Sequence, residues 1–194
     1  MSDIPNTKFL SKVIIFIGSM FSGKSTALIR ECSRFEAIGM EVLYINHTLD
    51  TRTGDYIQTH THNKKQAIKF TKLSDIPDQL FNTAQIIGID EAQFFPDLYD
   101  FVLKCEASEK TVVIAGLDGD SERKPFGQIL QCIPLCDSVT KLTAMDMISK
   151  DGSDAIFSLR LKGVQTDGQV CVGASDKFVA VNRANYIKEM SQRS

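Results

Sequence analysis

A short glycine-bounded segment has the residue types and spacing needed to hold phosphate groups. Gly18, Gly23, Lys24 and Ser25 follow the pattern Gly-x4-Gly-Lys-Ser. In this pattern the glycines let consecutive backbone N–H groups point at phosphate oxygens, while the lysine reaches the β and γ phosphates and the serine binds Mg²⁺. A plain strand-to-helix turn would need the glycines but neither Lys24 nor Ser25. The segment therefore predicts a site for a nucleoside triphosphate with Mg²⁺.

Two acidic residues could complete this site. Asp90 and Glu91 follow the apolar run 86–89, and phosphate sites of this kind use an acidic residue at the end of another buried strand to hold Mg²⁺. We expect Asp90 to bind Mg²⁺ and Glu91 to place a second carboxylate in the same cleft. The alternative is that Asp90 caps a turn and Glu91 is solvated. Asp-Glu-Ala-Gln at 90–93 also suggests a helicase, but 194 residues leave no room for a second motor lobe.

Alternating strands and helices are expected to position these residues. Four short apolar runs are β-branched and nearly continuous, as expected of strands buried on both faces of a parallel sheet. These runs are 13–17, 42–45, 86–89 and 112–115. Stretches 24–38 and 97–108, with apolar residues at helical spacing, lie between strands. The pattern predicts an α/β core with right-handed crossovers.

The pattern changes near residue 141, which divides the chain into three parts. Residues 1–140 are expected to form the α/β core, residues 141–186 a small β-rich lobe, and residues 187–194 a solvated tail. The lobe is expected to contain one turn and two short strands. These are residues 150–154, 155–160 and 169–172.

The composition excludes several classes of protein. Lys and Arg total 22 against 24 Asp and Glu, with a formal net charge of −2, so we expect no nucleic-acid partner. The apolar run 13–17 is far shorter than the roughly 20 residues that span a membrane, and the N-terminal residues do not resemble a secretory signal. Five cysteines without a Cys-x-x-Cys pair indicate reduced thiols. We expect a soluble cytoplasmic protein that does not bind membranes.

The motifs of the chain resemble those of the type II thymidine kinases, a tetrameric cytosolic family related in sheet order to RecA-like P-loop proteins. They occur in the family's order over most of the chain. They are Gly-Ser-Met-Phe-Ser-Gly-Lys-Ser-Thr at 18–26, Asp-Thr-Arg at 50–52, Thr-His at 59–60, Ile-Asp-Glu-Ala-Gln-Phe-Phe-Pro-Asp at 89–97, Gly-Leu-Asp-Gly at 116–119, Arg-Lys-Pro-Phe-Gly at 123–127, Lys-Leu-Thr-Ala at 141–144 and Gly-Ala-Ser-Asp-Lys-Phe at 173–178.

The resemblance implies a fold, an activity and partners. The fold is a P-loop NTPase with a RecA-like, mostly parallel sheet and a small C-terminal lobe that carries a flexible lasso loop. The activity is transfer of the γ-phosphate of ATP to the 5′-hydroxyl of thymidine or deoxyuridine, giving the monophosphate in pyrimidine deoxynucleotide salvage. ATP and Mg²⁺ are the implied cofactors, and a homotetramer is the implied assembly.

The resemblance also implies roles for single residues. Glu91 matches the base that takes the proton from the deoxyribose 5′-hydroxyl, while Lys24 and Arg52 match groups that stabilise developing charge. Because phosphoryl transfer passes through a loose transition state, we expect Glu91 mainly to orient the hydroxyl. Ser25 and Asp90 are the implied Mg²⁺ ligands. Without the resemblance, a surface ion pair between Asp50 and Arg52 would be as well supported as an active-site role for these residues.

Two larger sets follow from matching the family position by position. The ATP-binding set is Gly18, Ser19, Met20, Phe21, Ser22, Gly23, Lys24, Ser25, Thr26, Asp50, Thr51, Arg52, Asp90 and Gln93. The nucleoside-binding set is Met20, Phe94, Leu117, Ser121, Phe126, Ser158, Gln169, Val170, Cys171, Val172, Gly173 and Phe178. Residues 169–173 are the lasso backbone expected to hydrogen-bond thymine. The alternative for Met20 and Phe94 is a simple core position.

The chain departs from the family where two Cys-x-x-Cys pairs normally hold zinc. Asp146, Ser149, Asn182 and Asn185 occupy these positions. The set lacks the thiolates and imidazoles that zinc prefers, so we expect no structural zinc. The lobe is then expected to be held by apolar packing or to be mobile. The candidates for that packing are Phe157, Phe178, Val179 and Tyr186.

Two further departures affect the expected nucleoside site. Ser121 replaces a phenylalanine that stacks on the base in the family, and Phe178 replaces a tyrosine. Because loss of a stacking partner costs on the order of 1 kcal/mol, we expect weaker or altered nucleoside affinity. Ser121, together with Asn182 and Asn185, favours a second hypothesis, a catalytically weak or inactive nucleotide-binding relative with a regulatory or subunit role. The presence of Gly23, Lys24, Ser25, Asp90 and Glu91 favours an active kinase.

Overall fold

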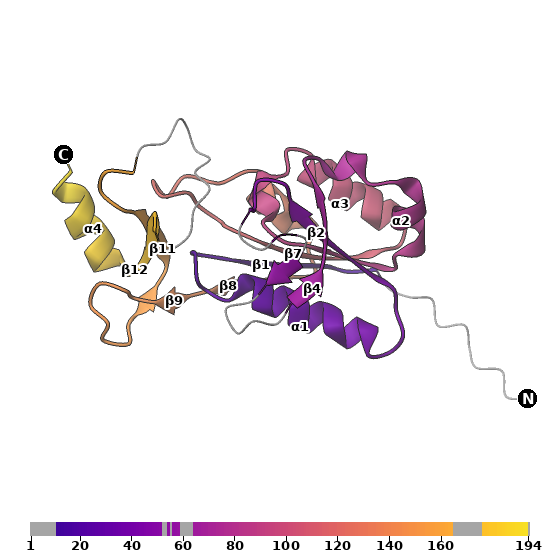
Figure 1. Ribbon diagram of the computed structural model, residues 1–194, viewed down its shortest axis with the longest axis horizontal. Coiled ribbons are helices and arrows are strands. Elements are labelled where there is room, and N and C mark those ends of the chain that lie inside the picture. The colour runs from indigo at the N-terminus through magenta and orange to yellow at the C-terminus, as the bar shows by residue number, and fades with distance from the viewer. Residues whose placement is uncertain (1–10, 52–53, 55, 59–63, 165–175, 194) are drawn as a thin grey trace, which may run out of the picture.

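A six-stranded sheet forms the centre of the molecule (Figure 1). The computed structural model describes residues 11–51, 54, 56–58, 64–164 and 176–193. The strands are β1 (Val13–Gly18), β2 (Val42–His47), β5 (Ile68–Phe70), β6 (Ile86–Ile89), β7 (Thr111–Gly116) and β8 (Ser138–Leu142). Their order is β5-β2-β6-β7-β1-β8, and all neighbours are parallel. One strand, β7, separates β1 from β6, which confirms the predicted RecA-like arrangement.

Helices cover both faces of this sheet, which explains why its central strands β6 and β7 are buried throughout. They are α1 (Lys24–Glu36), α2 (Asp78–Thr83) and α3 (Leu98–Ala107). Leu28 and Cys32 of α1 belong to a buried cluster on one face. Leu98 and Val102 of α3 belong to a second cluster, on the other face, to which α2 also contributes. Figure 1 shows α1 on the side of the sheet opposite α2 and α3.

Short elements complete the sheet domain. They are β3 (Tyr56–Gln58), β4 (Lys64–Gln66) and the 3₁₀ helices η1 (Leu73–Asp75), η2 (Ala92–Phe94) and η3 (Ile129–Leu135). β3 and β4 pair as antiparallel strands, and Ile57 of β3 packs into the α1 cluster. Among the described residues, no helix has the length and apolar character needed to cross a membrane.

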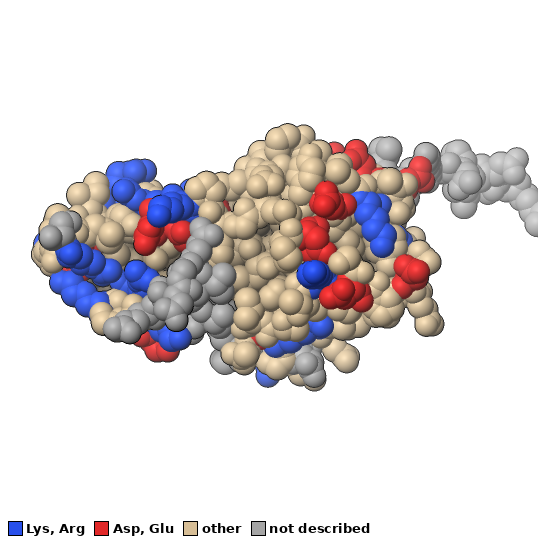
Figure 2. All heavy atoms as spheres, turned by 90° about the horizontal axis from the view of Figure 1, so that it is seen from above, with Lys and Arg blue, Asp and Glu red and all other residues tan. Residues whose placement is uncertain are grey.

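A small lobe follows the sheet and carries the last helix (Figure 1). Its elements are β9 (Ala144–Met145), β10 (Asp154–Ala155), β11 (Phe157–Arg160), β12 (Phe178–Val181) and α4 (Arg183–Ser191). β9 pairs with β10 and β11 with β12, both antiparallel. Leu159, Val181 and Tyr186 form a buried cluster, with Phe157 and Val179 packed against it. Apolar packing therefore contributes to the lobe, while Figure 2 shows Lys and Arg side chains gathered over its surface.

Most of the predicted core elements are confirmed. All four predicted strands are present as β1, β2, β6 and β7. The two predicted helices correspond to α1, which ends at Glu36, and to α3. The predicted strand at 155–160 is divided between β10 and β11. The predicted strand at 169–172 lies outside the described residues.

The end of the chain differs from the prediction. Residues 187–191 were expected to belong to a solvated tail, but they complete α4. Asn182 caps the helix, and the buried Tyr186 anchors it. The other residues of α4 are mostly polar, so the sequence shows no helical spacing of apolar residues from which α4 could have been predicted. β8 also continues past residue 140, because Leu142 pairs with Gly18 of β1. The division of the chain into core and lobe stays a prediction.

Candidate active site

The predicted phosphate-binding loop connects β1 to α1. Gly18 ends β1, and Lys24 begins α1. Gly23 has a φ of 83°, a left-handed conformation that favours glycine. A Cβ atom on Gly18 would lie 2.1 Å from the carbonyl oxygen of Leu142, so any side chain there would force β1 away from β8. The backbone therefore requires glycine at position 18 and favours it at position 23.

Lys24 folds back over this loop. Its Nζ donates a hydrogen bond to the carbonyl oxygen of Ser19 (2.6 Å) and a longer one to the hydroxyl oxygen of Ser22 (3.5 Å). A phosphate group in the loop would offer oxygens to the same ammonium group, which has three donors and a full charge. Lys24 is thus already placed at the loop to which the motif assigns it.

The loop is also joined to the lobe. Ser19 Oγ donates to the carbonyl oxygen of Ala155 (3.0 Å), and Met20 N donates to Ser158 Oγ (2.9 Å). Phe21 packs against the buried alanines of β9, β10 and β12. The structure therefore brings together Met20 and Ser158, two residues predicted to bind the nucleoside. Their contact with a nucleoside stays a prediction.

Asp90 meets Ser25 at the carboxyl edge of the sheet. Asp90 is only 4% exposed, its carboxylate accepts a hydrogen bond from Glu91 N (3.0 Å), and the Ser25 hydroxyl lies beside it. Burial, and next the neighbouring Glu91 carboxylate, raise the pKa of Asp90 to about 7. Oxygen ligands suit Mg²⁺, and a bound cation would stabilise this buried charge. Ser25 and Asp90 therefore fit the predicted Mg²⁺ site.

Asp90→Asn is expected to stabilise the metal-free protein at pH 8. The pKa of Asp90 in the folded protein is raised from 3.8 to about 7. The protonated carboxyl therefore makes its full contribution to stability below the unfolded-state pKa, and this contribution is lost as the pH rises through about 7. A neutral amide avoids this loss. In EDTA, we expect the thermal midpoint to rise by roughly 3 °C or more, the shift that about 1 kcal/mol produces in a domain of this size.

The gain is expected to shrink at pH 5, where the Asp90 carboxyl is already protonated. Asp100→Asn, at an exposed position in the first turn of α3, is the matched control and is expected not to raise the midpoint, because its carboxylate interacts favourably with the helix dipole. If Asp90→Asn at pH 8 unfolds at or below the temperature of the unchanged protein, burial of the Asp90 charge is not costly and the prediction is wrong.

Glu91 is held in place by Gln93. Glu91 has a φ of 52°, which is uncommon for a residue with a side chain. Gln93 Nε2 donates to Glu91 Oε2 (2.6 Å), and Gln93 Oε1 accepts from Leu117 N (2.9 Å). Because Gln93 is buried, its amide fixes Glu91 relative to the end of β7. The resemblance placed Gln93 with ATP, whereas in the structure both ends of its amide are engaged by Glu91 and Leu117.

Aromatic rings gather next to this group. Phe94 and Phe126, both predicted to bind the nucleoside, pack edge to face with ring centroids 5.6 Å apart. The His47 ring lies 5.6 Å from Phe94 and accepts a hydrogen bond from Leu49 N at Nδ1 (3.0 Å). Burial lowers the pKa of His47, which favours the neutral ring. His47 had no role assigned from the sequence, and the structure places it beside the predicted nucleoside wall.

A buried polar pair lies at the carboxyl end of β2. Asn46 Nδ2 donates to Asp50 Oδ2 (2.9 Å), and the Lys69 ammonium group donates to the Asp50 carbonyl oxygen. The resemblance placed Asp50 in the ATP site, but Asn46 was missed. A signal was available, because Asn46 is a polar residue near the carboxyl end of a buried parallel strand. Ligands of open α/β sheets bind at that edge.

The other predicted residues are less informative. Thr26, in the first turn of α1, and Thr51, after β2, are both exposed. Phe178 begins β12 and is buried. Arg52 and the lasso segment 169–173 lie outside the described residues, so their roles stay predictions.

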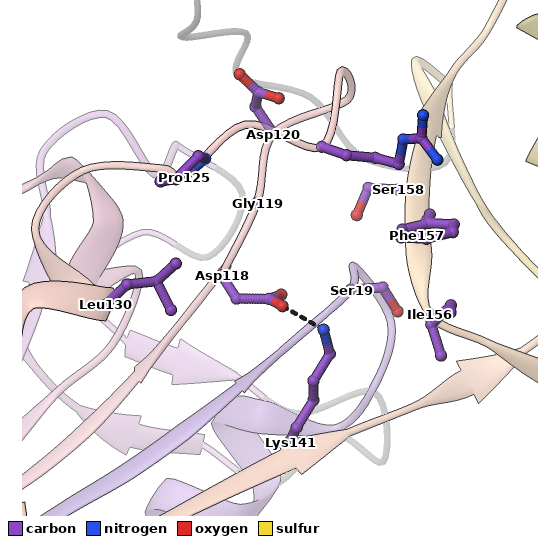
Figure 3. A pocket seen from close by; sticks show the side chains of 11 residues that line it. Ser19, Asp118, Gly119, Asp120, Pro125, Leu130, Lys141, Ile156, Phe157 and Ser158 are labelled. Atoms are coloured by element: carbon purple, nitrogen blue, oxygen red, sulfur yellow. Dashed lines mark ion pairs between the residues drawn. The ribbon is translucent and has the colours of Figure 1, made fainter. Parts of the chain in front are cut away.

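A cleft of about 190 Å³ opens between the sheet and the lobe (Figure 3). Ser19, Phe157 and Ser158 line it beside an ion pair between Lys141 Nζ and Asp118 Oδ2 (2.6 Å). Of the described residues predicted to bind the nucleoside, only Ser158 lines this cleft. Its volume is also below the roughly 300 Å³ of small-molecule sites. The cleft therefore adjoins the predicted nucleoside site without coinciding with it.

Known proteins resemble the chain over most of its length. A family model described as thymidine kinase matches residues 11–186. The human protein named cytosolic thymidine kinase is 39% identical over 185 residues, which cover 95% of this chain and 77% of that protein. The thymidine kinase of Vaccinia virus (strain Western Reserve) is 41% identical over 173 residues, which cover 89% of this chain and 95% of that protein. Since this similarity spans both the sheet and the lobe, the chain belongs to the thymidine kinase family.

Proposed function

We propose that the protein is an ATP-dependent thymidine kinase. It transfers the γ-phosphate of ATP to the 5′-hydroxyl of thymidine or deoxyuridine and produces the monophosphate for pyrimidine deoxynucleotide salvage. The observation that carries the proposal is the contact between Ser25, at the start of α1, and the buried Asp90 carboxylate after β6, with Glu91 as the next residue. This contact supports a Mg²⁺–ATP site and a second carboxylate at one edge of the sheet. The human and viral relatives are named thymidine kinases, and on this ground we propose thymidine as the nucleoside.

Lys24, Ser25 and Asp90 serve the phosphate side of the reaction. Lys24 exchanges its contact with Ser19 for oxygens of the β and γ phosphates, where its charge stabilises the transferred group. Mg²⁺ held by Ser25 and Asp90 would neutralise charge on the same phosphates. Arg52 is proposed to add a further positive charge, as in the family.

Glu91 serves the nucleoside side. It accepts the proton of the 5′-hydroxyl and, before that, orients this hydroxyl toward the γ-phosphate. Gln93 acts as a positioning residue, since its amide joins Glu91 to the backbone of Leu117. Phe94, Phe126 and Met20 form the wall against the base, while residues 169–173 are proposed to hydrogen-bond its edge.

A second candidate function is a catalytically weak or inactive nucleotide-binding relative. The observation that favours it is Ser121, which cannot stack on a base as the family's phenylalanine does. The phosphate side of the site is unaffected by this change. The two functions therefore differ in nucleoside binding rather than in the predicted phosphate chemistry.

Transfer of radiolabelled γ-phosphate from ATP to a panel of deoxynucleosides separates the two functions. We expect thymidine and deoxyuridine to be phosphorylated, with a KM for thymidine higher than that of a relative that keeps the stacking phenylalanine. Ser121→Phe is expected to lower this KM by roughly 5-fold, because one aromatic contact contributes about 1 kcal/mol. No transfer to any nucleoside by the unchanged protein would exclude the kinase and leave the second candidate.

Family membership also supports proposals on assembly and location. We propose a cytoplasmic location, since the human and bovine relatives are named cytosolic. We also propose a homotetramer, on the resemblance to the tetrameric type II thymidine kinases alone. Sedimentation velocity of the purified protein tests the assembly, and a monomer at micromolar concentration would contradict it.

A further inference from the structure

A buried carboxylate ties together three segments of the lobe. Asp146 is 2% exposed. It accepts hydrogen bonds from the backbone N–H groups of Ile148 (2.9 Å), Ser149 (2.6 Å) and Asn182 (2.5 Å), and from Asn185 Nδ2 (2.9 Å). Burial alone would raise the pKa of Asp146, but these hydrogen bonds hold it below its ordinary value. Asp146 therefore joins the turn after β9 to the end of β12 and the start of α4.

The same cluster fixes where α4 begins. The Asn182 side chain caps the helix by accepting from Asn185 N (2.8 Å), and its Nδ2 donates to Ser153 Oγ (3.1 Å). Asn185 Nδ2 also donates to Ser149 Oγ (2.8 Å). The first turn of α4 is thus connected to both ends of the loop between β9 and β10, so its direction depends on the Asp146 cluster.

These residues do not fit a zinc ion. Asp146, Ser149, Asn182 and Asn185 stand where the resemblance places the zinc ligands, but they are hydrogen-bonded to one another. An amide N–H group directed into the cluster is no metal ligand, and the set has neither thiolate nor imidazole. Hydrogen bonds therefore join the segments that zinc would join.

The helix fixed in this way reaches the sheet domain through Tyr186. Tyr186 is 2% exposed, and its hydroxyl donates to the carbonyl oxygen of Ser121 (2.7 Å). The Arg123 guanidinium group lies over the Tyr186 ring at 4.6 Å from its centroid and over Phe157 at 5.5 Å. One side chain of α4 thus holds two residues of the loop at 119–127.

This loop forms part of the predicted nucleoside wall. It carries Ser121 and Phe126, and Phe126 packs against Phe94. At its end, a Cβ atom on Gly127 would lie 2.1 Å from the carbonyl oxygen of Gln93, so the loop rests directly on the residue that holds Glu91. Movement of the loop would therefore displace the wall around the nucleoside, whereas Lys24 is held by Ser19 and Ser22, outside this loop.

We propose that Asp146 and Tyr186 are positioning residues for nucleoside binding. Asp146 sets the start of α4, and Tyr186 transmits this position to Ser121 and the loop at 119–127. The proposal rests on the thymidine kinase function proposed above. It also makes the hydrogen-bonded cluster, rather than a metal ion, the element that orders the lobe.

Tyr186→Phe is the first test, because it removes only the hydroxyl bonded to Ser121. We expect KM for thymidine to rise roughly 3- to 10-fold, as loss of one hydrogen bond produces, with KM for ATP unchanged. Tyr99→Phe on α3 is the matched control and is expected to change neither constant. An equal rise in both KM values, or no rise for thymidine, overturns the proposal.

Asp146→Asn tests the other end of the connection. An amide has one acceptor oxygen, so it cannot accept all four hydrogen bonds of the carboxylate. We expect a rise in KM for thymidine at least as large as that of Tyr186→Phe. Asp75→Asn, an exposed aspartate in η1, is the control and is expected to behave as the unchanged protein. One tightly held zinc per chain in metal analysis of the purified protein overturns the proposed role of the cluster.

Hydrogen exchange gives a readout that needs no catalysis. Backbone hydrogen bonds at Asp120, Arg123 and Phe126 make the loop at 119–127 suitable for this measurement. We expect faster exchange there in Tyr186→Phe and Asp146→Asn, but not in Asp75→Asn. Faster exchange in a protein without transfer activity supports the positioning roles while excluding the proposed kinase. Unchanged exchange in an active protein overturns the positioning roles alone.

Discussion

Lys24→Met is expected to reduce kcat for phosphoryl transfer to thymidine by roughly 10³-fold, the upper range for removal of one charge-stabilising donor. In the structure the Lys24 ammonium group lies at the phosphate loop, 2.6 Å from the Ser19 carbonyl oxygen. Methionine keeps an unbranched apolar stem but removes the charge and all three donors. Initial rates with both substrates saturating measure the loss, because saturation separates kcat from binding.

Lys12→Met is the matched control for this substitution. Lys12 is exposed immediately before β1, so the variant has the same change in charge without altering the loop. We expect its kcat to equal that of the unchanged protein. If Lys24→Met retains more than about a tenth of the original kcat, Lys24 stabilises the transition state far less than a catalytic hydrogen-bond donor does in comparable sites.

The sequence was sufficient to predict those parts of the site that depend on neighbouring residues. The apolar run ending at Ile89 predicted β6, and the acidic pair that follows had to emerge at the carboxyl edge of a parallel sheet. Likewise the spacing of Gly18, Gly23 and Lys24 predicted a loop between a strand and a helix. In both cases the local backbone and the periodicity carry the information.

Contacts between distant segments were not predictable in this way. Gln93 meets Leu117, which is 24 residues away, and Tyr186 meets Ser121, which is 65 residues away. Such pairs depend on the register of the sheet and on how the lobe packs, which periodicity does not encode. Helix α4 was missed for a related reason. A short, mostly polar segment is not helical by propensity alone, and Asn182 and Tyr186 stabilise it through tertiary contacts.

Glu91→Gln is expected to lower kcat by roughly 10²-fold, with little change in KM for either substrate. This is the lower end of the range for general bases, because a loose transition state needs little proton transfer while the phosphoryl group moves. Glutamine keeps the length of the side chain and an oxygen that can accept from Gln93 Nε2, so the local structure is preserved. The lost group is the carboxylate that accepts the proton.

Glu106→Gln, at an exposed position of α3, controls for the change of charge and is expected to leave kcat unaltered. Full activity of Glu91→Gln would show that Glu91 is not the base, even if the protein is a kinase. The double variant Lys24→Met with Glu91→Gln then tests whether the two groups act in one transition state. Because residues that act as a unit have non-additive effects, we expect its loss to be smaller than the product of the single losses. A fully multiplicative loss would mean that charge stabilisation by Lys24 and hydroxyl orientation by Glu91 are independent contributions.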